Sequence, residues 1–180
     1  MRGNAASALG KLKVASEAVV DALVQSLTDE VSSVRGNAAS ALGKLKVVSE
    51  AVVDALVQSL TDEDSWVRQN AAPALGELKV VSEAVVDALV QSLTDEDSWV
   101  RGNAAQALGE LKVASEAVVD ALLQSLTDEV SLVRGNAASA LGKLGKQSDT
   151  VLPRVIAWIE EHQDSEYLGR GIDALWDLVK

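Results

Sequence analysis

Residues 67–78 read VRQNAAPALGEL, and this stretch decides the fold. Its apolar residues recur at intervals of three and four, the spacing that puts side chains on one face of an α-helix. Asp64 or Ser65 just before it can cap the N-terminus of a helix that runs to about Lys79. We call this the A helix, and its predicted core face consists of Val67, Ala71, Ala74, Leu75 and Leu78.

The same stretch returns every 33 residues, and its arginine occurs at Arg2, Arg35, Arg68, Arg101 and Arg134. A fixed period of this length indicates a repeat architecture. Blocks 64–96 and 97–129 differ at only four positions. Such near-identity indicates either recent amplification of the array or idealisation by design.

Each block contains a second helix, the B helix. In the third block it begins after Ser82 and runs to about Thr94, with a predicted core face of Val85, Val86, Leu89 and Leu93. A helix pair this small cannot bury its own apolar face, so neighbouring pairs must stack. We therefore predict an all-α solenoid of antiparallel helix pairs that forms one domain, 1–180. The predicted repeats are about 1–30, 31–63, 64–96, 97–129 and 130–163, followed by a capping helix over 164–180.

Small residues flank both core faces. They are Ala72 and Gly76 on the A helix, and Ala84, Ala88 and Ser92 on the B helix. Glycine inside a helix costs about 1 kcal/mol relative to alanine, so its recurrence predicts close helix packing. Near the C-terminus the matching positions hold Thr150, Arg154, Trp158, Ile172 and Trp176. Large or charged residues in place of small ones indicate a terminal cap.

The first A helix lacks the lead-in that precedes the arginine in the later copies, which reads Asp-Ser-Trp-Val in the third and fourth. We therefore expect Val20 and Val24 of the first B helix to be exposed. Two interpretations stay open: the chain begins inside a longer array, or this end mediates self-association.

The recurring run Val-Arg-x-x-Ala-Ala-x-Ala-Leu-Gly resembles the first helix of HEAT-like repeats, of the short kind also found in phycobilisome lyases. Pro73 is similar to the kinking proline of many such helices. The resemblance implies a right-handed superhelix, with A helices on the convex side and B helices on the concave side. It also implies a scaffolding or protein-binding role.

Composition excludes several classes of function. The net charge of −11 and isoelectric point near 4.5 disfavour nucleic acid and anionic membrane surfaces as partners. The sequence has no cysteine, which removes disulfides, thiolate catalysis and cysteine-based zinc sites, and suits a cytoplasmic protein. No motif resembles a nucleophile with its base, a phosphate loop or a metal cluster. We expect no enzyme activity and no cofactor.

The acidic turns, such as residues 61–64, lack the glycine and ligand spacing of a calcium-binding EF-hand loop. They are better interpreted as helix caps. Asp62 and its copies are expected to pair with Arg68 and its copies in a structural ladder. His162, the only histidine, is expected to be solvated.

The first candidate site is a double row of carboxylates on the solvent side of the B helices. It comprises Glu17, Asp21, Glu50, Asp54, Glu83, Asp87, Glu116 and Asp120. This acidic B-helix face can bind a basic peptide or protein surface. It can equally be a solvated face whose first-turn acids favour the helix dipole.

The second candidate is a stripe on the A helices that carries Trp66 and Trp99 at equivalent positions. Two exposed tryptophans can form a binding hot spot. Alternatively, each packs over the seam between repeats.

These features predict a non-catalytic scaffold or protein-binding module. The family likeness alone suggests another class, a bilin lyase-type protein that handles chromophores. The near-identical repeats suggest a third, an engineered scaffold with no native partner.

Overall fold

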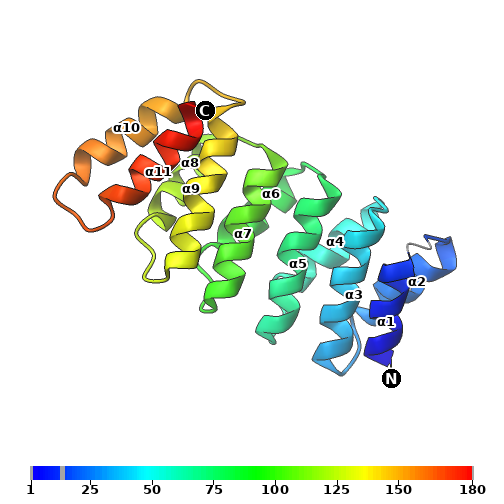
Figure 1. The fold of residues 1–180 in the computed structure, drawn as a ribbon. Coiled ribbons are helices and arrows are strands. Elements are labelled where there is room, and N and C mark those ends of the chain that lie inside the picture. Colours follow the sequence, from blue (N-terminus) through cyan, green and yellow to red (C-terminus); the bar gives the residue numbers. More distant parts are fainter. Residues whose placement is uncertain (1, 13–14, 180) are drawn as a thin grey trace. The chain divides into compact units, whose positions relative to one another are not determined.

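The computed structural model describes residues 2–12 and 15–179, and every regular element in these ranges is an α-helix (Figure 1). This confirms the all-α solenoid class. The A helices are α1 (Arg2–Leu12), α3 (Ser32–Leu45), α5 (Ser65–Leu78), α7 (Ser98–Leu111), α9 (Ser131–Gly145) and α11 (Leu168–Val179). The B helices are α2 (Glu17–Ser26), α4 (Glu50–Ser59), α6 (Glu83–Ser92), α8 (Glu116–Ser125) and α10 (Val151–Glu161). None of the described helices is long and apolar enough to cross a membrane.

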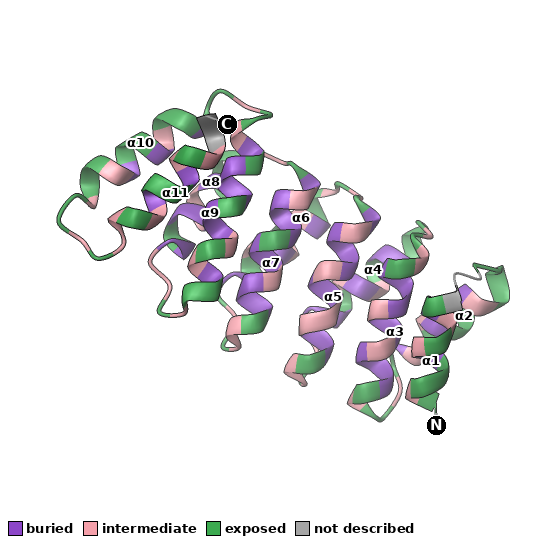
Figure 2. Cartoon of the chain, in the orientation of Figure 1, coloured by how far each residue is buried: buried purple, intermediate pink, exposed green. Residues whose placement is uncertain are grey.

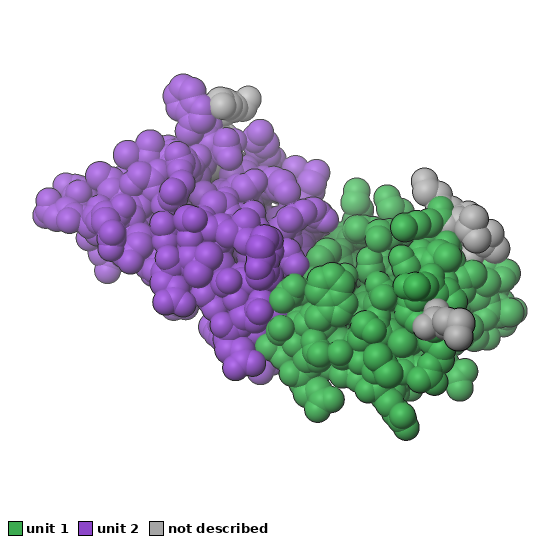
Figure 3. Space-filling view, turned by 60° about the horizontal axis from the view of Figure 1, so that its bottom comes forward, with its two compact units in different colours: residues 1–88 green, residues 89–180 purple. Residues whose placement is uncertain are grey.

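The chain divides into two compact units, residues 1–88 and 89–180, with the division inside α6 (Figure 3). In the first unit α3 lies between α1 and α5, and α2 and α4 cover one side of these A helices. In the second unit α9 lies between α7 and α11, with α8 and α10 packed against α9. Each unit is thus a layer of A helices backed by a layer of B helices.

The core is aliphatic and follows the predicted faces (Figure 2). All five residues of the predicted A-helix face are buried, and Leu75 is fully so. On the B helix Val85, Leu89 and Leu93 are buried, but Val86 is only half-buried.

Glycines in the A helices allow the close approach that their recurrence predicted. A methyl group on Gly43 would lie 2.7 Å from Cα of Ala74 on the next A helix. The equivalent distance from Gly109 to Ala140 is 2.8 Å. Backbone meets backbone at these crossings, so a side chain has no space.

The helix ends follow local sequence signals. The carboxylate of Asp64 accepts a hydrogen bond of 2.9 Å from the backbone N–H of Trp66, and Ser49 accepts one from Val52. Three A helices end at a lysine in the left-handed conformation, with φ of 54–58°. These residues are Lys46, Lys79 and Lys112.

The predicted ladder of arginines and aspartates forms, and each pair joins neighbouring repeats: Arg35 pairs with Asp62, and Arg101 with Asp128. Nε and Nη2 of Arg35 each donate a 2.7 Å hydrogen bond to the carboxylate of Asp62, one repeat further on. Nη1 of Arg35 donates to the backbone carbonyl of Asp29 in its own turn. Nη1 of Arg68 likewise donates to the backbone carbonyl of Asp62 in its own turn. The guanidinium of Arg35 therefore ties two consecutive inter-repeat turns together.

One expectation about the chain ends is corrected. Val20 is buried, with 8% of its surface exposed, and Val24 is half-buried, because α2 packs against α3 and α4 of the following repeat. At the other end Trp158 is buried, whereas Ile172 and Trp176 are 50% and 60% exposed. Of the large residues that replace small ones, Trp158 is therefore buried, whereas Ile172 and Trp176 leave apolar surface exposed on α11.

Candidate functional site

The acidic residues of the B helices lie on the solvent side, as the helical spacing predicted. Seven of the eight carboxylate side chains are exposed, and Asp120 is half-buried. In the first unit α2 and α4 contact each other, so Glu17 and Asp21 lie on the helix next to Glu50 and Asp54. Each pair is four residues apart, one turn of helix, so its two carboxylates share a face.

A pocket of about 350 Å³ lies between α2 and α4. Val24, Leu27 and Thr28 contribute from one side, and Ala55 and Gln58 from the other. A second pocket, of about 270 Å³, lies in the second unit. Its lining consists of the equivalents of the first pocket's residues, each 66 positions later in the sequence, together with Thr127. The repeat therefore builds the same polar-rimmed hollow more than once on its B-helix face.

The hollow between α8 and α10 is larger, about 650 Å³, and differs in its lining. Four of its lining residues differ from their equivalents in the 270 Å³ pocket. Ala121, Gln124, Ser125 and Asp128 of that pocket are replaced here by Arg154, Ala157, Trp158 and Glu161. The lining of this pocket therefore departs from the repeat, and it contains a cationic and an aromatic side chain that the 350 and 270 Å³ pockets lack.

Arg154 forms ion pairs with both acids of α8. Its Nη2 donates a hydrogen bond to Oδ1 of Asp120, and its Nη1 lies 3.4 Å from Oε1 of Glu116. Sequence reasoning identified Arg154 only as part of a cap and missed this contact. The signal was present, since the 33-residue alignment places Arg154 one B helix after the Glu116–Asp120 pair.

His162 is not freely solvated. Its ring stacks on Trp158 with centroids 4.1 Å apart and planes 11° from parallel. Its Nδ1 lies 2.9 Å from the backbone carbonyl oxygen of Trp158, and the indole also packs against Gly171 of α11. The aromatic pair thus joins the pocket to α11, and the four-residue spacing of its members could have indicated the contact.

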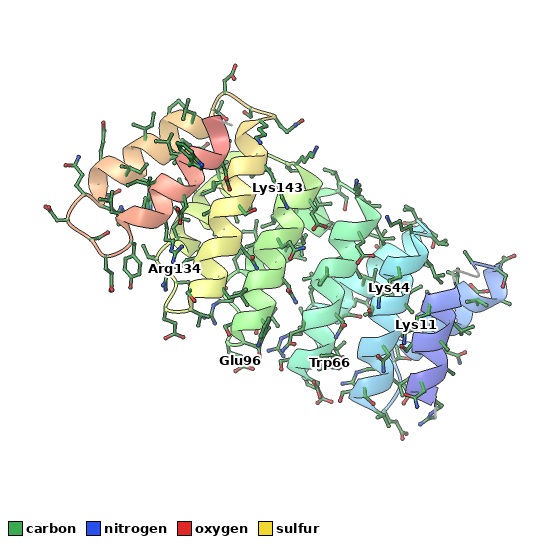
Figure 4. All side chains as sticks on the ribbon, in the orientation of Figure 1. Lys11, Lys44, Trp66, Glu96, Arg134 and Lys143 are labelled. Atoms are coloured by element: carbon green, nitrogen blue, oxygen red, sulfur yellow. The ribbon has the colours of Figure 1, made fainter. Side chains whose placement is uncertain are left out.

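The A-helix stripe presents its tryptophans at the N-terminal ends of α5 and α7, as Figure 4 shows for Trp66. Trp66 is 48% exposed and Trp99 58% exposed. The indole of Trp66 covers Gly36, where an added methyl group would lie 2.6 Å from Cδ1. Trp66 therefore packs over the seam between α3 and α5, and its role as a hot spot stays a prediction.

Charge, rather than a reactive group, dominates the B-helix face. Among residues 2–12 and 15–179, no cluster of three or more His, Asp or Glu side chains could hold a metal ion. What the arrangement offers is paired carboxylates beside shallow pockets, which can bind cationic side chains.

Comparison with known proteins agrees with this architecture. The family of HEAT repeats matches residues 1–76, 33–109, 53–128 and 86–176. None of the curated proteins matches the chain.

Solved structures with a similar fold include designed repeat proteins. An engineered protein is 30% identical, with a TM-score of 0.67, over 98% of this chain and 90% of its own. Computationally designed armadillo repeat proteins for modular peptide recognition are 19% identical, with a TM-score of 0.63, over 97% and 92%.

The complex of CpcE and CpcF of phycocyanin lyase from Nostoc sp. PCC7120 is 25% identical, over 98% of this chain and 88% of its own. Its TM-score of 0.48 is too low to inform function. The family matches, by contrast, extend from residue 1 to residue 176 and repeat along the array. The chain belongs to the HEAT-repeat family.

Proposed function

We propose that the chain is a non-catalytic protein-binding module that uses its B-helix face to bind a basic peptide or a basic protein surface. The observation that carries this proposal is the recurrent pocket between successive B helices, flanked by exposed carboxylates. A face that repeats the same hollow and the same charges suits an extended ligand with a repeating chemistry.

Electrostatics favour the same choice. Glu17, Asp21, Glu50 and Asp54 lie on two contacting helices, so their charges reinforce one another. A net charge of −11 adds a long-range field that steers cationic partners and repels anionic ones.

The A-helix stripe is the weaker candidate surface. Trp66 already covers Gly36, so part of its indole area contributes to repeat stacking.

The fold likeness to armadillo proteins designed for modular peptide recognition also supports a peptide as the partner class.

The test is fluorescence anisotropy with a labelled lysine- and arginine-rich peptide at low and high salt. We expect Asp21→Asn combined with Asp54→Asn to weaken binding about tenfold, since each exposed ion pair contributes roughly 0.5–1 kcal/mol. The matched control, Glu77→Gln with Glu110→Gln, removes two charges from the A helices α5 and α7 and should change binding less than twofold. Equal loss in both variants would contradict a B-helix site.

A scaffold without a native partner is the second candidate. The 30% identity to an engineered protein and the near-identity of blocks 64–96 and 97–129 favour it. Absence of peptide binding at any salt concentration would support this candidate instead.

A further inference from the structure

We propose that each Glu–Asp pair on a B helix is a seat for one arginine of the partner, and that Arg154 fills the last seat from within the chain. The inference rests on the proposed function of the B-helix face and specifies its ligand chemistry. We call a pair such as Glu116–Asp120, spaced four residues apart, an arginine seat.

The occupied seat is observed directly. The guanidinium of Arg154 spans one helical turn of α8, with Nη2 on Asp120 and Nη1 toward Glu116. The Asp120 side chain is 44% exposed and that of Arg154 33% exposed, so the pair is partly desolvated. This contact joins different helices, because Arg154 belongs to α10.

A copy of this Glu–Asp pair, with alanine at the position of Arg154, lies in the first unit, 99 residues earlier. Glu17 and Asp21 on α2 match Glu116 and Asp120, and Ala55 on α4 matches Arg154. Both acids are exposed, and Ala55 lines the pocket of about 350 Å³ between the two helices. A methyl group thus stands where α10 carries a long cationic side chain, and the pocket leaves that space to a partner.

Arginine suits the seat better than lysine. A guanidinium presents several N–H donors in one plane and can address two carboxylates at once, as Arg154 does. An ammonium group is a compact point charge and gains less from two acceptors on separate residues.

The spacing of seats sets the spacing of arginines. Packed helices lie about 8–10 Å apart, and an extended chain advances about 3.3 Å per residue. Arginines three residues apart therefore match the neighbouring seats on α2 and α4, which contact each other.

The experiment measures binding of a synthetic peptide with four arginines, one for each Glu–Asp pair and each separated by two Gly or Ser residues, against its lysine counterpart. Arg154→Ala opens the last seat and should tighten arginine-peptide binding about two- to fivefold, the effect of one exposed ion pair. Its control is Arg170→Ala, which removes the same charge from the Arg170–Asp173 pair on α11 and should change binding less.

The reverse variant introduces an arginine beside the Glu17–Asp21 pair, at the position equivalent to Arg154. Ala55→Arg should pair with Glu17 and Asp21 and weaken arginine-peptide binding about two- to fivefold. Val48→Arg adds the same charge at an exposed position outside the helices and serves as the control. Circular dichroism of each variant confirms that the comparison is between folded chains.

The outcomes separate the two proposals. Binding that weakens with Asp21→Asn and Asp54→Asn, yet responds equally to Arg154→Ala and Arg170→Ala, retains the B-helix site and overturns the seats. Equal affinity for the arginine and lysine peptides also overturns them. No binding of either peptide overturns the proposed function itself.

Discussion

Gly43 shows how a single residue controls repeat stacking. Alanine is better than glycine inside a helix by about 1 kcal/mol, but overpacking against backbone typically costs 1–3 kcal/mol. Because Cα of Ala74 lies 2.7 Å from the position of the new methyl group, the steric cost exceeds the gain. We expect Gly43→Ala to lower the free energy of unfolding by about 1 kcal/mol in urea titrations.

Gly135 in α9 supplies the control, since an added methyl group there has nothing within 4 Å. We expect Gly135→Ala to raise the free energy of unfolding by about 0.5–1 kcal/mol through helix propensity. If both substitutions stabilise the chain, the close approach of the A helices does not constrain Gly43.

The Arg101–Asp128 pair gives stability a pH dependence. Burial raises the pKa of Asp128, but the hydrogen bonds from Arg101 and from the backbone N–H of Val130 outweigh it, so the pKa lies below its ordinary value. A carboxylate with a lowered folded-state pKa contributes stability above its unfolded value of about 3.9, and loses it as the pH falls toward the folded value.

We expect Asp128→Asn to cost about 1.5–3 kcal/mol at neutral pH, the contribution of hydrogen bonds to a charged group. The difference from the native chain should shrink as the pH drops below about 4. Thermal unfolding across this range measures it. Glu129→Gln is the control, because that side chain is 86% exposed and 3.7 Å from Arg101, and should have little effect. A difference that stays constant with pH would argue against the carboxylate as its origin.

At the scale of the helix, Pro73 is the residue that conflicts with its element. It lies inside α5, where it cannot donate to the carbonyl of Gln69 and its ring crowds the previous turn. The equivalent residue of α7 is Gln106, and the two helices have the same length of 14 residues. The fold thus accommodates proline here at an energetic cost.

We expect Pro73→Gln to raise the free energy of unfolding by about 1–3 kcal/mol, since proline is about 3 kcal/mol worse than alanine in a helix interior. Gln106→Pro should lower it by a similar amount, as measured by chemical denaturation. Should Pro73→Gln leave stability unchanged, the surroundings of α5 already compensate for the missing hydrogen bond.

The periodic pattern was sufficient to predict the helices and their buried faces, because spacing alone determines which residues share a side. It could not predict what covers the ends. Val20 is buried by the following repeat, so the missing lead-in does not expose it. Trp158 and His162 depart from the repeat, and their stacking depends on side-chain placement in α10 that no period encodes.

The candidate site divides in the same way. Exposure of the B-helix acids follows from helical spacing and was predictable. The ion pairs of Arg154 with Asp120 and Glu116 join residues that are 34 and 38 positions apart. Neither spacing equals the 33-residue period, so the contact can be predicted only after the repeats have been aligned. A departure from the repeat is therefore the informative signal in an array whose regular positions mainly build the scaffold.

At the scale of the whole molecule, near-identical blocks should be interchangeable. Removing residues 64–96 joins position 63 to Asp97 and places Trp99 after block 31–63, in the position that Trp66 holds on Gly36. Each repeat of a solenoid contacts its neighbours alone, so the shortened array retains equivalent interfaces.

We expect this shortened chain to fold cooperatively with unchanged helix content per residue and a lower unfolding temperature, because one stacking interface is lost. Circular dichroism during heating measures both quantities. The control removes residues 71–102, one residue fewer, so that the junction lies inside the A helix and rotates all following residues of that helix by about 100° relative to Val67. That variant should lose cooperativity, since its apolar face no longer meets the preceding repeat. If the two deletions behave alike, stacking in this array does not depend on the 33-residue register. The arginine seats and pockets of different repeats could then not be treated as structurally equivalent.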